Sequence, residues 1–328
     1  MRYNQLGVSD LELSHVGLGG ASFSNIYGNF DEEKSLAIIN EALTRGVNYI
    51  ETSYWYGQGV SEKTIAKALT GVPRKYYYIG SKVGRYEKDM ANMFDFSAEK
   101  TAAAVDDTLQ RLEVEYVDLI QVHDATFASD INVILKETLP ALEQAVRDGK
   151  ARYIGIADYD IELMQEIVEE SDVKISAVLS YAKSTLFDNR LQNYVKYFKS
   201  KGVGVINAAA TGMGLLCNMG PQPWHPASDD VKAICREASE FCKAHNVELA
   251  RLATWFTISQ PGIDCNVCGF TTTEQMNDTL DLFETGLTAH EQSVLVEVQS
   301  RFFDKGILHW DNIELSDYRA KLDEVQAP

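Results

Sequence analysis

Val117-Asp118-Leu119-Ile120-Gln121-Val122-His123 is a short, mostly apolar run that ends in a histidine. Two earlier runs have the same form, because Val47 to Ile50 is followed by Glu51, and Tyr76 to Ser81 is followed by Lys82. Such runs are typical of parallel strands, which are buried on both faces. A lysine or a histidine at the end of a buried strand is costly to desolvate without a partner. We therefore expect these polar residues to share one site.

The whole chain alternates strand-like and helix-like segments. The expected strands are 16–19, 47–51, 77–82, 117–122, 152–157, 177–181, 203–208 and 265–269. The expected helices are 31–45, 97–112, 133–148, 160–170, 190–201, 228–245 and 273–284. This alternation predicts a parallel α/β sheet, and eight strands are the number that closes into a (β/α)8 TIM barrel. An open doubly wound sheet is the alternative, but no G-x-G-x-x-G motif opens a first helix.

Three segments lie outside the repeat. Residues 3–14 predict an N-terminal β-hairpin, and residues 289–305 predict an additional C-terminal helix followed by a tail. Residues 221–226 form a long irregular connection, of the kind that usually shapes a substrate pocket in a barrel. No linker divides the chain, so we expect one barrel domain over residues 1–328.

Composition excludes several classes of partner. With 30 basic and 48 acidic residues, the 328-residue chain has a formal charge of −18, which argues against nucleic acid and anionic membranes. It shows neither a signal-peptide pattern nor a membrane-spanning run, so we expect a cytoplasmic protein. The five cysteines fit reduced thiols, and the C-x-x-C at 265–268 lies in a strand, where its two thiols would point to opposite faces. We expect no metal site.

The strand-end residues have complementary chemistry. Barrel strands converge at their carboxyl ends, which would bring Glu51, Tyr56, Lys82 and His123 together. A phenol has a pKa of about 10, and a nearby ammonium lowers it. The carboxylate would hold the ammonium, and the imidazole would orient a carbonyl oxygen. Such a set can donate a proton to an oxygen or remove one from a hydroxyl, and a nicotinamide cofactor would supply the missing hydride chemistry.

At this point the chain resembles the aldo-keto reductase superfamily. The similar segments are Glu51-Thr52-Ser53-Tyr54-Trp55-Tyr56-Gly57, Ser81-Lys82 and Val122-His123-Asp124, and the likeness extends over nearly the whole chain. Within the family the chain most resembles the aldose dehydrogenase branch, to which Trp224-His225-Pro226-Ala227-Ser228 is rather specific. The resemblance implies a barrel with Tyr56 as the general acid/base, Lys82 tuning Tyr56, and His123 orienting the substrate.

The resemblance also implies residues for the two ligands. Cofactor contacts are expected at Gly19, Gly20, Ala157, Asp158, Ala209, Thr211, Gly212, Gly214, Gly269, Phe270, Thr271, Gln275, Asp278 and Thr279. Substrate contacts are expected at Phe23, Tyr54, Trp55, Asp124 and Trp224. The helix after Gly269 would present its N-terminus to phosphate, and Thr271 and Glu274 have capping-box spacing.

Three departures from the family pattern bear on function. Glu51 stands where the family has an aspartate, which moves the charge by about 1.5 Å, and such a shift can cost about 100-fold in rate. Ala157-Asp158 stands where many relatives have a serine or threonine, so it has no hydroxyl to bind the carboxamide of the nicotinamide. Gly269, Phe270 and Gln275 carry no positive charge where NADP-preferring relatives place lysine or arginine, so we expect NAD to bind better, although NADP is possible.

The expected function is that of a nicotinamide-dependent oxidoreductase. It would transfer hydride to or from the C1 hydroxyl or carbonyl of an aldose or small aldehyde, as a monomer or weak homo-oligomer. One alternative is a general NADPH-dependent carbonyl reductase. Another, suggested by the substitution at Glu51, is a weakly active or inactive nucleotide-binding barrel with a regulatory role.

Overall fold

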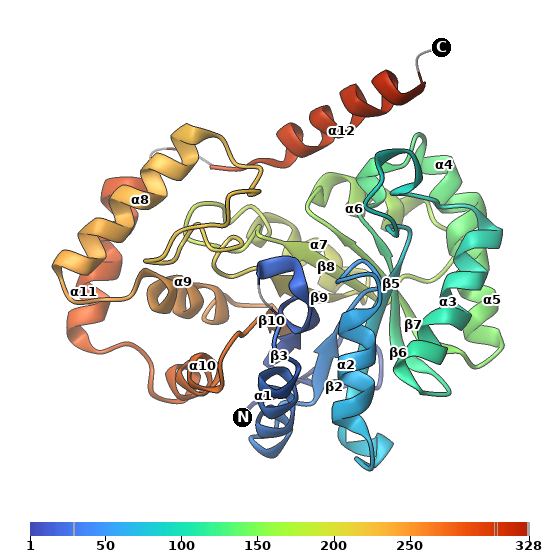
Figure 1. Ribbon diagram of the computed structural model, residues 1–328, viewed down its shortest axis with the longest axis horizontal. Coiled ribbons are helices and arrows are strands. Elements are labelled where there is room, and N and C mark those ends of the chain that lie inside the picture. The colour runs from blue at the N-terminus through green and yellow to red at the C-terminus, as the bar shows by residue number, and fades with distance from the viewer. Residues whose placement is uncertain (29, 305, 307, 327–328) are drawn as a thin grey trace.

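The computed structural model describes residues 1–28, 30–304, 306 and 308–326, and it contains a closed barrel of eight parallel strands (Figure 1). The strands are β3 (Val16–Gly19), β4 (Tyr49–Glu51), β5 (Tyr78–Val83), β6 (Val117–His123), β7 (Ala151–Asp158), β8 (Ala177–Tyr181), β9 (Gly204–Ala208) and β10 (Cys265–Cys268). β10 pairs with both β9 and β3, which closes the sheet. The expected (β/α)8 TIM barrel is confirmed.

Helices surround the barrel on its outer face, except for the last, which lies across one end (Figure 1). They are α1 (Glu32–Thr44), α2 (Val60–Leu69), α3 (Ala98–Leu112), α4 (Ile131–Val133), α5 (Leu139–Arg147), α6 (Ile161–Glu170), α7 (Gln192–Ser200), α8 (Asp229–Ala244), α9 (Leu249–Ile258), α10 (Thr273–Thr285), α11 (Ala289–Val298) and α12 (Asp311–Gln326). Side-chain N-caps start most of the expected helices, including Asp31 for α1 and Ser97 for α3. No helix in the described part of the chain combines the length and apolarity needed to cross a membrane.

Three helices were not expected from the sequence. α2 begins after Gly59, which has a φ of 87° and supplies no side-chain cap. α9 is apolar on most of its surface, so it lacks the one-sided stripe that marks an amphipathic helix. The segment after α11 was expected to be a tail, and that expectation was wrong, because α12 occupies it.

The expected N-terminal hairpin is present and closes one end of the barrel. It consists of β1 (Tyr3–Gln5) and β2 (Glu12–Ser14). Its leucines, Leu6, Leu11 and Leu13, pack in one cluster with inward-facing strand residues such as Leu119 and Ile206. Gly7 has a φ of 54°, and a Cβ there would overlap the backbone of Gly202 and Val203. The hairpin turn therefore requires a glycine.

The C-terminal helix lies across the other end of the molecule. In Figure 1, α12 extends along the top of the view from the side of α8 towards α4, far from the N-terminus at the bottom. Its Tyr318 belongs to a small cluster with Met93, Phe127 and Tyr159, which are contributed by the loops after β5, β6 and β7. The ring of Tyr318 meets that of Phe127 edge-on at 5.2 Å. This helix thus packs on loops that leave the carboxyl ends of the strands.

Candidate active site

Four side chains meet at the carboxyl ends of β4, β5 and β6. Lys82 Nζ lies 3.2 Å from the hydroxyl of Tyr56 and forms an ion pair with Glu51 Oε1. The rings of Tyr56 and His123 meet edge-on with their centres 6.0 Å apart. Glu51, Lys82 and His123 are buried, whereas Tyr56 is partly exposed. The structure thus brings together the four residues expected from the strand-end pattern.

The ammonium of Lys82 uses all three of its hydrogens. It donates to Glu51 Oε1, to the carbonyl oxygen of Thr52 over 3.0 Å, and to the Tyr56 hydroxyl. Burial lowers the pKa of Lys82, but the negative charge of Glu51, with a smaller contribution from Tyr56, outweighs burial and leaves the pKa raised. Lys82 is therefore a charged donor to Tyr56.

Tyr56 departs from the expectation of an unusually acidic phenol. Burial raises its pKa, Lys82 lowers it, and Glu51 raises it again, so that the net pKa lies above the ordinary value of 10. The expectation considered the ammonium but not the removal of the phenol from water. In this state Tyr56 is protonated near neutral pH, and its oxygen accepts a hydrogen bond from Lys82 while its own hydrogen is available to a ligand.

His123 is a neutral imidazole whose Nδ1 lies against the Ser53 hydroxyl. The Ser53 hydroxyl accepts from the Trp55 amide and lies 3.2 Å from His123 Nδ1. When the Ser53 hydroxyl donates to Nδ1, the proton of the neutral ring is on Nε2. Burial lowers the pKa of His123 to about 3, although the nearby charge of Asp124 opposes this effect. Nε2 can therefore donate a hydrogen bond to a substrate oxygen.

The buried His123 predicts a loss of stability in acid. Its pKa is about 3 when folded and about 6.5 when unfolded. The unfolded chain then binds the extra proton between these values, so this contribution to stability falls as the pH drops from 6.5 towards 3. We expect His123→Asn to reduce the slope of unfolding free energy against pH by up to about 1.4 kcal/mol per pH unit. Urea unfolding from pH 4.5 to 7 would measure it, and parallel slopes would contradict it.

Three of the expected substrate residues lie beside His123 or at the surface. Asp124 pairs with Arg85 over 2.7 Å beside His123, and the ring of Trp55 packs 4.3 Å from the same guanidinium. Trp224 is exposed, and its ring lies 5.9 Å from that of Tyr27.

Two other expected substrate residues point elsewhere. Phe23 is fully buried in the main core and offers no surface to a ligand, so the structure contradicts its assignment. The ring of Tyr54 packs against Arg111 of α3 and against Tyr86, which directs it towards the outer helices rather than to His123.

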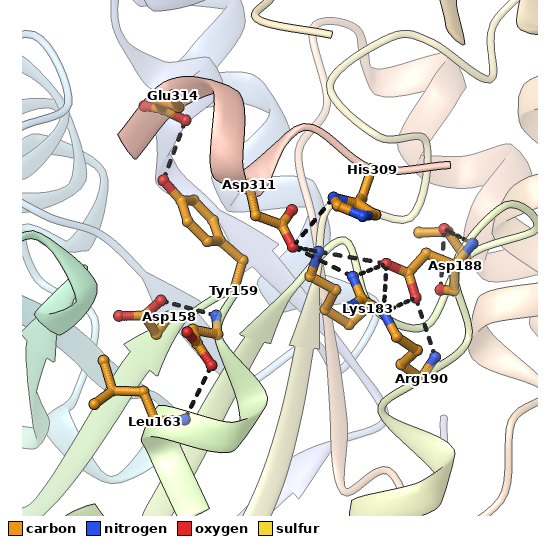
Figure 2. A network of polar contacts seen from close by, with 11 residues as sticks. Asp158, Tyr159, Leu163, Lys183, Asp188, Arg190, His309, Asp311 and Glu314 are labelled. Carbon is orange, nitrogen blue, oxygen red and sulfur yellow. Dashed lines mark hydrogen bonds and ion pairs between the residues drawn. The ribbon is translucent and has the colours of Figure 1, made fainter. Parts of the chain in front are cut away.

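The C-terminal helix contributes acidic groups beside the site. Glu314 accepts from the hydroxyl of Tyr159 over 3.2 Å and lies 3.5 Å from Arg85. Figure 2 shows the neighbouring network, in which Asp311 meets Lys183 and Arg190. The contact between Glu314 and Arg85 therefore connects α12 to the loop after β5, which is more than 200 residues away in the sequence.

The expected cofactor residues gather along the ends of β3, β7, β9 and β10. Gly19 ends β3 next to Gly269, and Gly20 follows it beside the backbone of Glu51. Ala157 faces the barrel interior at the level of His123. Ala209, Gly212 and Gly214 follow β9 with positive φ, and Thr211 lies between them. On α10, Asp278 is exposed, while Thr279 is buried.

Asp158 and Phe270 have roles within the fold, and the cap of α10 differs from the expected one. Asp158 is fully buried and accepts from the backbone N–H groups of Thr126 and Asp160, so its carboxylate joins two loops instead of facing a ligand. Burial raises its pKa well above the ordinary value. The N-cap of α10 is Thr272, one residue later than the expected capping box, and it accepts from the N–H of Gln275. Phe270 is buried, and its N–H donates to Ser22.

The structure adds residues that were not expected from the sequence. Tyr49 and Gln121 contact Glu51 inside the barrel, and Tyr27 and Tyr181 lie near Tyr56. Tyr49 and Gln121 each stand two residues before an expected site residue, so strand alternation places them on the same face. The described residues contain no cluster of three or more histidine, cysteine or acidic side chains that could hold a metal ion.

Comparison with known proteins identifies the family. The model of the aldo/keto reductase family matches residues 15–299. This chain belongs to the aldo/keto reductase family. L-galactose dehydrogenase of Arabidopsis thaliana is 33% identical over 299 residues, covering 90% of this chain and 92% of that protein. D-arabinose 1-dehydrogenase of Saccharomyces cerevisiae is 32% identical over 286 residues, covering 83% of each.

Solved structures of aldo-keto reductases are similar in fold to this chain. A holo-form aldo-keto reductase of Bacillus halodurans is 26% identical with a TM-score of 0.72, covering 91% of this chain and 96% of that chain. The glycerol dehydrogenase of Gluconobacter oxydans, at 22% identity and a TM-score of 0.69, covers 93% and 97% and supports the fold alone. Aldo-keto reductases use nicotinamide cofactors, and this member is an NAD(P)-dependent oxidoreductase.

Proposed function

We propose that this aldo-keto reductase oxidises the C1 hydroxyl of the cyclic form of an aldose to a lactone, and that the same site reduces small aldehydes to alcohols when reduced cofactor is supplied. The main support is the contact between Tyr56 and Lys82, whose hydroxyl oxygen and ammonium nitrogen lie 3.2 Å apart, with the ring of a neutral His123 edge-on to that of Tyr56. The similarity to two dehydrogenases named for L-galactose and D-arabinose favours an aldose. Carboxylates and phenols near the site, including Asp124, Glu314 and Tyr159, suit a polyol because they accept and donate hydrogen bonds.

Each residue has one role in this proposal. In reduction, His123 Nε2 donates to the carbonyl oxygen, and Tyr56 transfers its hydroxyl proton to the same oxygen as hydride reaches the carbon. Lys82 stabilises the resulting phenolate, and Glu51 keeps Lys82 charged. In oxidation, the C1 hydroxyl gives its proton to the phenolate of Tyr56. A bound nicotinamide accepts hydride in one direction and supplies it in the other.

The chain offers groups that fit such a cofactor. Ala209, Gly212 and Gly214 have φ values of 61°, 56° and 96°, and at these three positions the backbone carries at most a methyl group. α10 begins at Thr273, where the first N–H groups of a helix attract phosphate. Asp158 is the exception, because its carboxylate is already bonded to backbone N–H groups.

A substrate panel tests the proposal. Purified protein is offered L-galactose, D-arabinose, other aldoses and aryl aldehydes with each oxidised or reduced cofactor, and absorbance of the reduced nicotinamide is followed. We expect an aldose to give the highest kcat/KM in oxidation. A preference for aryl aldehydes with NADPH would favour the general carbonyl reductase, and no turnover of any compound would contradict the proposal.

We expect NADH to bind about tenfold more tightly than NADPH. The start of α10 presents the carboxylate of Glu274 and no lysine or arginine to a 2′-phosphate, so it would repel that group. Lys34, whose charge acts on Glu274, already lies 3.3 Å from Asp31. Fluorescence titration of both reduced cofactors would measure the preference, and Glu274→Gln should strengthen NADPH binding. Tighter NADPH binding that is lost in Lys34→Ala would show that Lys34 serves the phosphate instead.

A further inference from the structure

Two uncharged side chains hold the carboxylate of Glu51 inside the barrel. The hydroxyl of Tyr49 donates to Oε2, and Gln121 Nε2 donates to Oε1 over 2.8 Å. Tyr49 and Gln121 are fully buried, and Glu51 is 2% exposed. Together with Lys82, these donors give both carboxylate oxygens fixed partners in a region closed to bulk water.

Two glycines make room for this arrangement. Gly80 is the register partner of Glu51 on the adjacent strand, and a Cβ there would overlap the Tyr49 hydroxyl and Glu51 Oε2. A Cβ at Gly155 would come within 2.9 Å of Gln121 Cγ. The absence of side chains at these positions therefore provides the space that the longer glutamate and its two donors occupy.

The donors are committed to Glu51. Gln121 Oε1 is buried and has no hydrogen-bond partner among the described residues, so the amide is oriented by what its nitrogen reaches. Burial, followed by the charge of Glu51, raises the pKa of Tyr49 well above the ordinary value, so Tyr49 stays a neutral donor. Neither side chain has a direct contact with Tyr56 or His123 among the hydrogen bonds described.

We propose that Tyr49 and Gln121 are positioning residues for proton transfer, which fix Glu51 so that Lys82 stays within hydrogen-bonding distance of Tyr56. A glutamate has one more rotatable bond than an aspartate, and its carboxylate needs donors on both oxygens to stay in one place. An aspartate at position 51 would draw the carboxylate back by about 1.5 Å and away from this set of donors. Glu51 is thus adapted to its surroundings in this chain. The inference rests on the proposed proton transfer through Tyr56.

A double-mutant cycle tests this coupling. Tyr49→Phe and Gln121→Met each remove one donor without adding charge, and each should lower kcat by about 10- to 100-fold, since misplacement of a reacting group by about 1 Å can cost 100-fold. KM and the dissociation constant for NADH should stay within about twofold. Glu51→Asp alone should also lower kcat, whereas Tyr49→Phe combined with Glu51→Asp should be more active than Glu51→Asp, because the buried hydroxyl no longer lacks an acceptor.

The control is Tyr77→Phe, which removes the hydroxyl of a tyrosine whose ring packs in the main core outside the barrel interior and should leave kcat unchanged. Unchanged kcat in both Tyr49→Phe and Gln121→Met would overturn the inference, as would losses that simply multiply in the double variant. If Tyr49→Phe does not fold, Gln121→Met decides the question. An inactive wild type, or full activity in Tyr56→Phe, would instead refute the proposed function, so the two failures are distinguishable.

Discussion

Replacing Tyr56 by phenylalanine is expected to lower kcat by about 10³-fold or more in both directions, because it removes the proton donor and leaves the rest of the site in place. The hydroxyl is the third acceptor of the Lys82 ammonium and lies beside the edge of His123. Binding of reduced cofactor should change little, since only one oxygen atom is lost. Steady-state kinetics and a fluorescence titration of NADH would measure both quantities.

The pH dependence should distinguish the two directions in the wild type. The pKa of Tyr56 lies above 10, so the protonated phenol that reduction requires is fully populated near neutral pH. Oxidation requires the phenolate, whose fraction increases tenfold per pH unit below that pKa. Oxidation should therefore accelerate with rising pH, whereas reduction should stay level near neutrality.

The control for this variant is Tyr54→Phe. Tyr54 lies in the same segment, but its ring packs on Arg111, so the loss of its hydroxyl should leave turnover near that of the wild type. If Tyr56→Phe kept wild-type turnover, another residue would carry the proton.

Local sequence patterns predicted the centre of the site because its members end neighbouring strands. Parallel strands in a barrel share one direction, so three strand ends determine where Glu51, Lys82 and His123 meet. The same alternation also places Tyr49 and Gln121 on the inner face, two residues before Glu51 and His123. The structure was needed to show that they contact Glu51 rather than merely fill the barrel.

Other features depend on long-range packing, which a single sequence does not reveal. Leu315, Tyr318 and Leu322 have the spacing of one helix face, but nothing local indicates that this face packs on the loops after β5 and β6. The pairing of Glu314 with Arg85 joins residues 229 positions apart. Phe23 and Tyr54 were expected to contact substrate because they are aromatic and lie near the site motifs. Their packing, which the sequence does not show, places Phe23 in the core and Tyr54 against Arg111 of an outer helix.

Lys82→Met is expected to have a large effect on both stability and activity. It leaves the Glu51 carboxylate buried without its cation, and breaking a buried pair in this way costs about 3–5 kcal/mol. It also removes the charge that stabilises the phenolate of Tyr56, so kcat should fall by about 100-fold or more. Urea unfolding and steady-state kinetics would measure the two losses separately.

The double variant Lys82→Met with Glu51→Gln separates these effects. Neutralising the carboxylate removes the unpaired charge. An amide at position 51 can accept from the Tyr49 hydroxyl through its oxygen and donate through its nitrogen to Gln121, whose Oε1 has no partner in the described residues and can turn to accept. We expect this variant to recover most of the lost stability while its kcat stays low, since no ammonium remains beside Tyr56. Recovery of activity along with stability would mean that Lys82 serves only to neutralise Glu51, and that the phenol transfers its proton without help from a neighbouring charge.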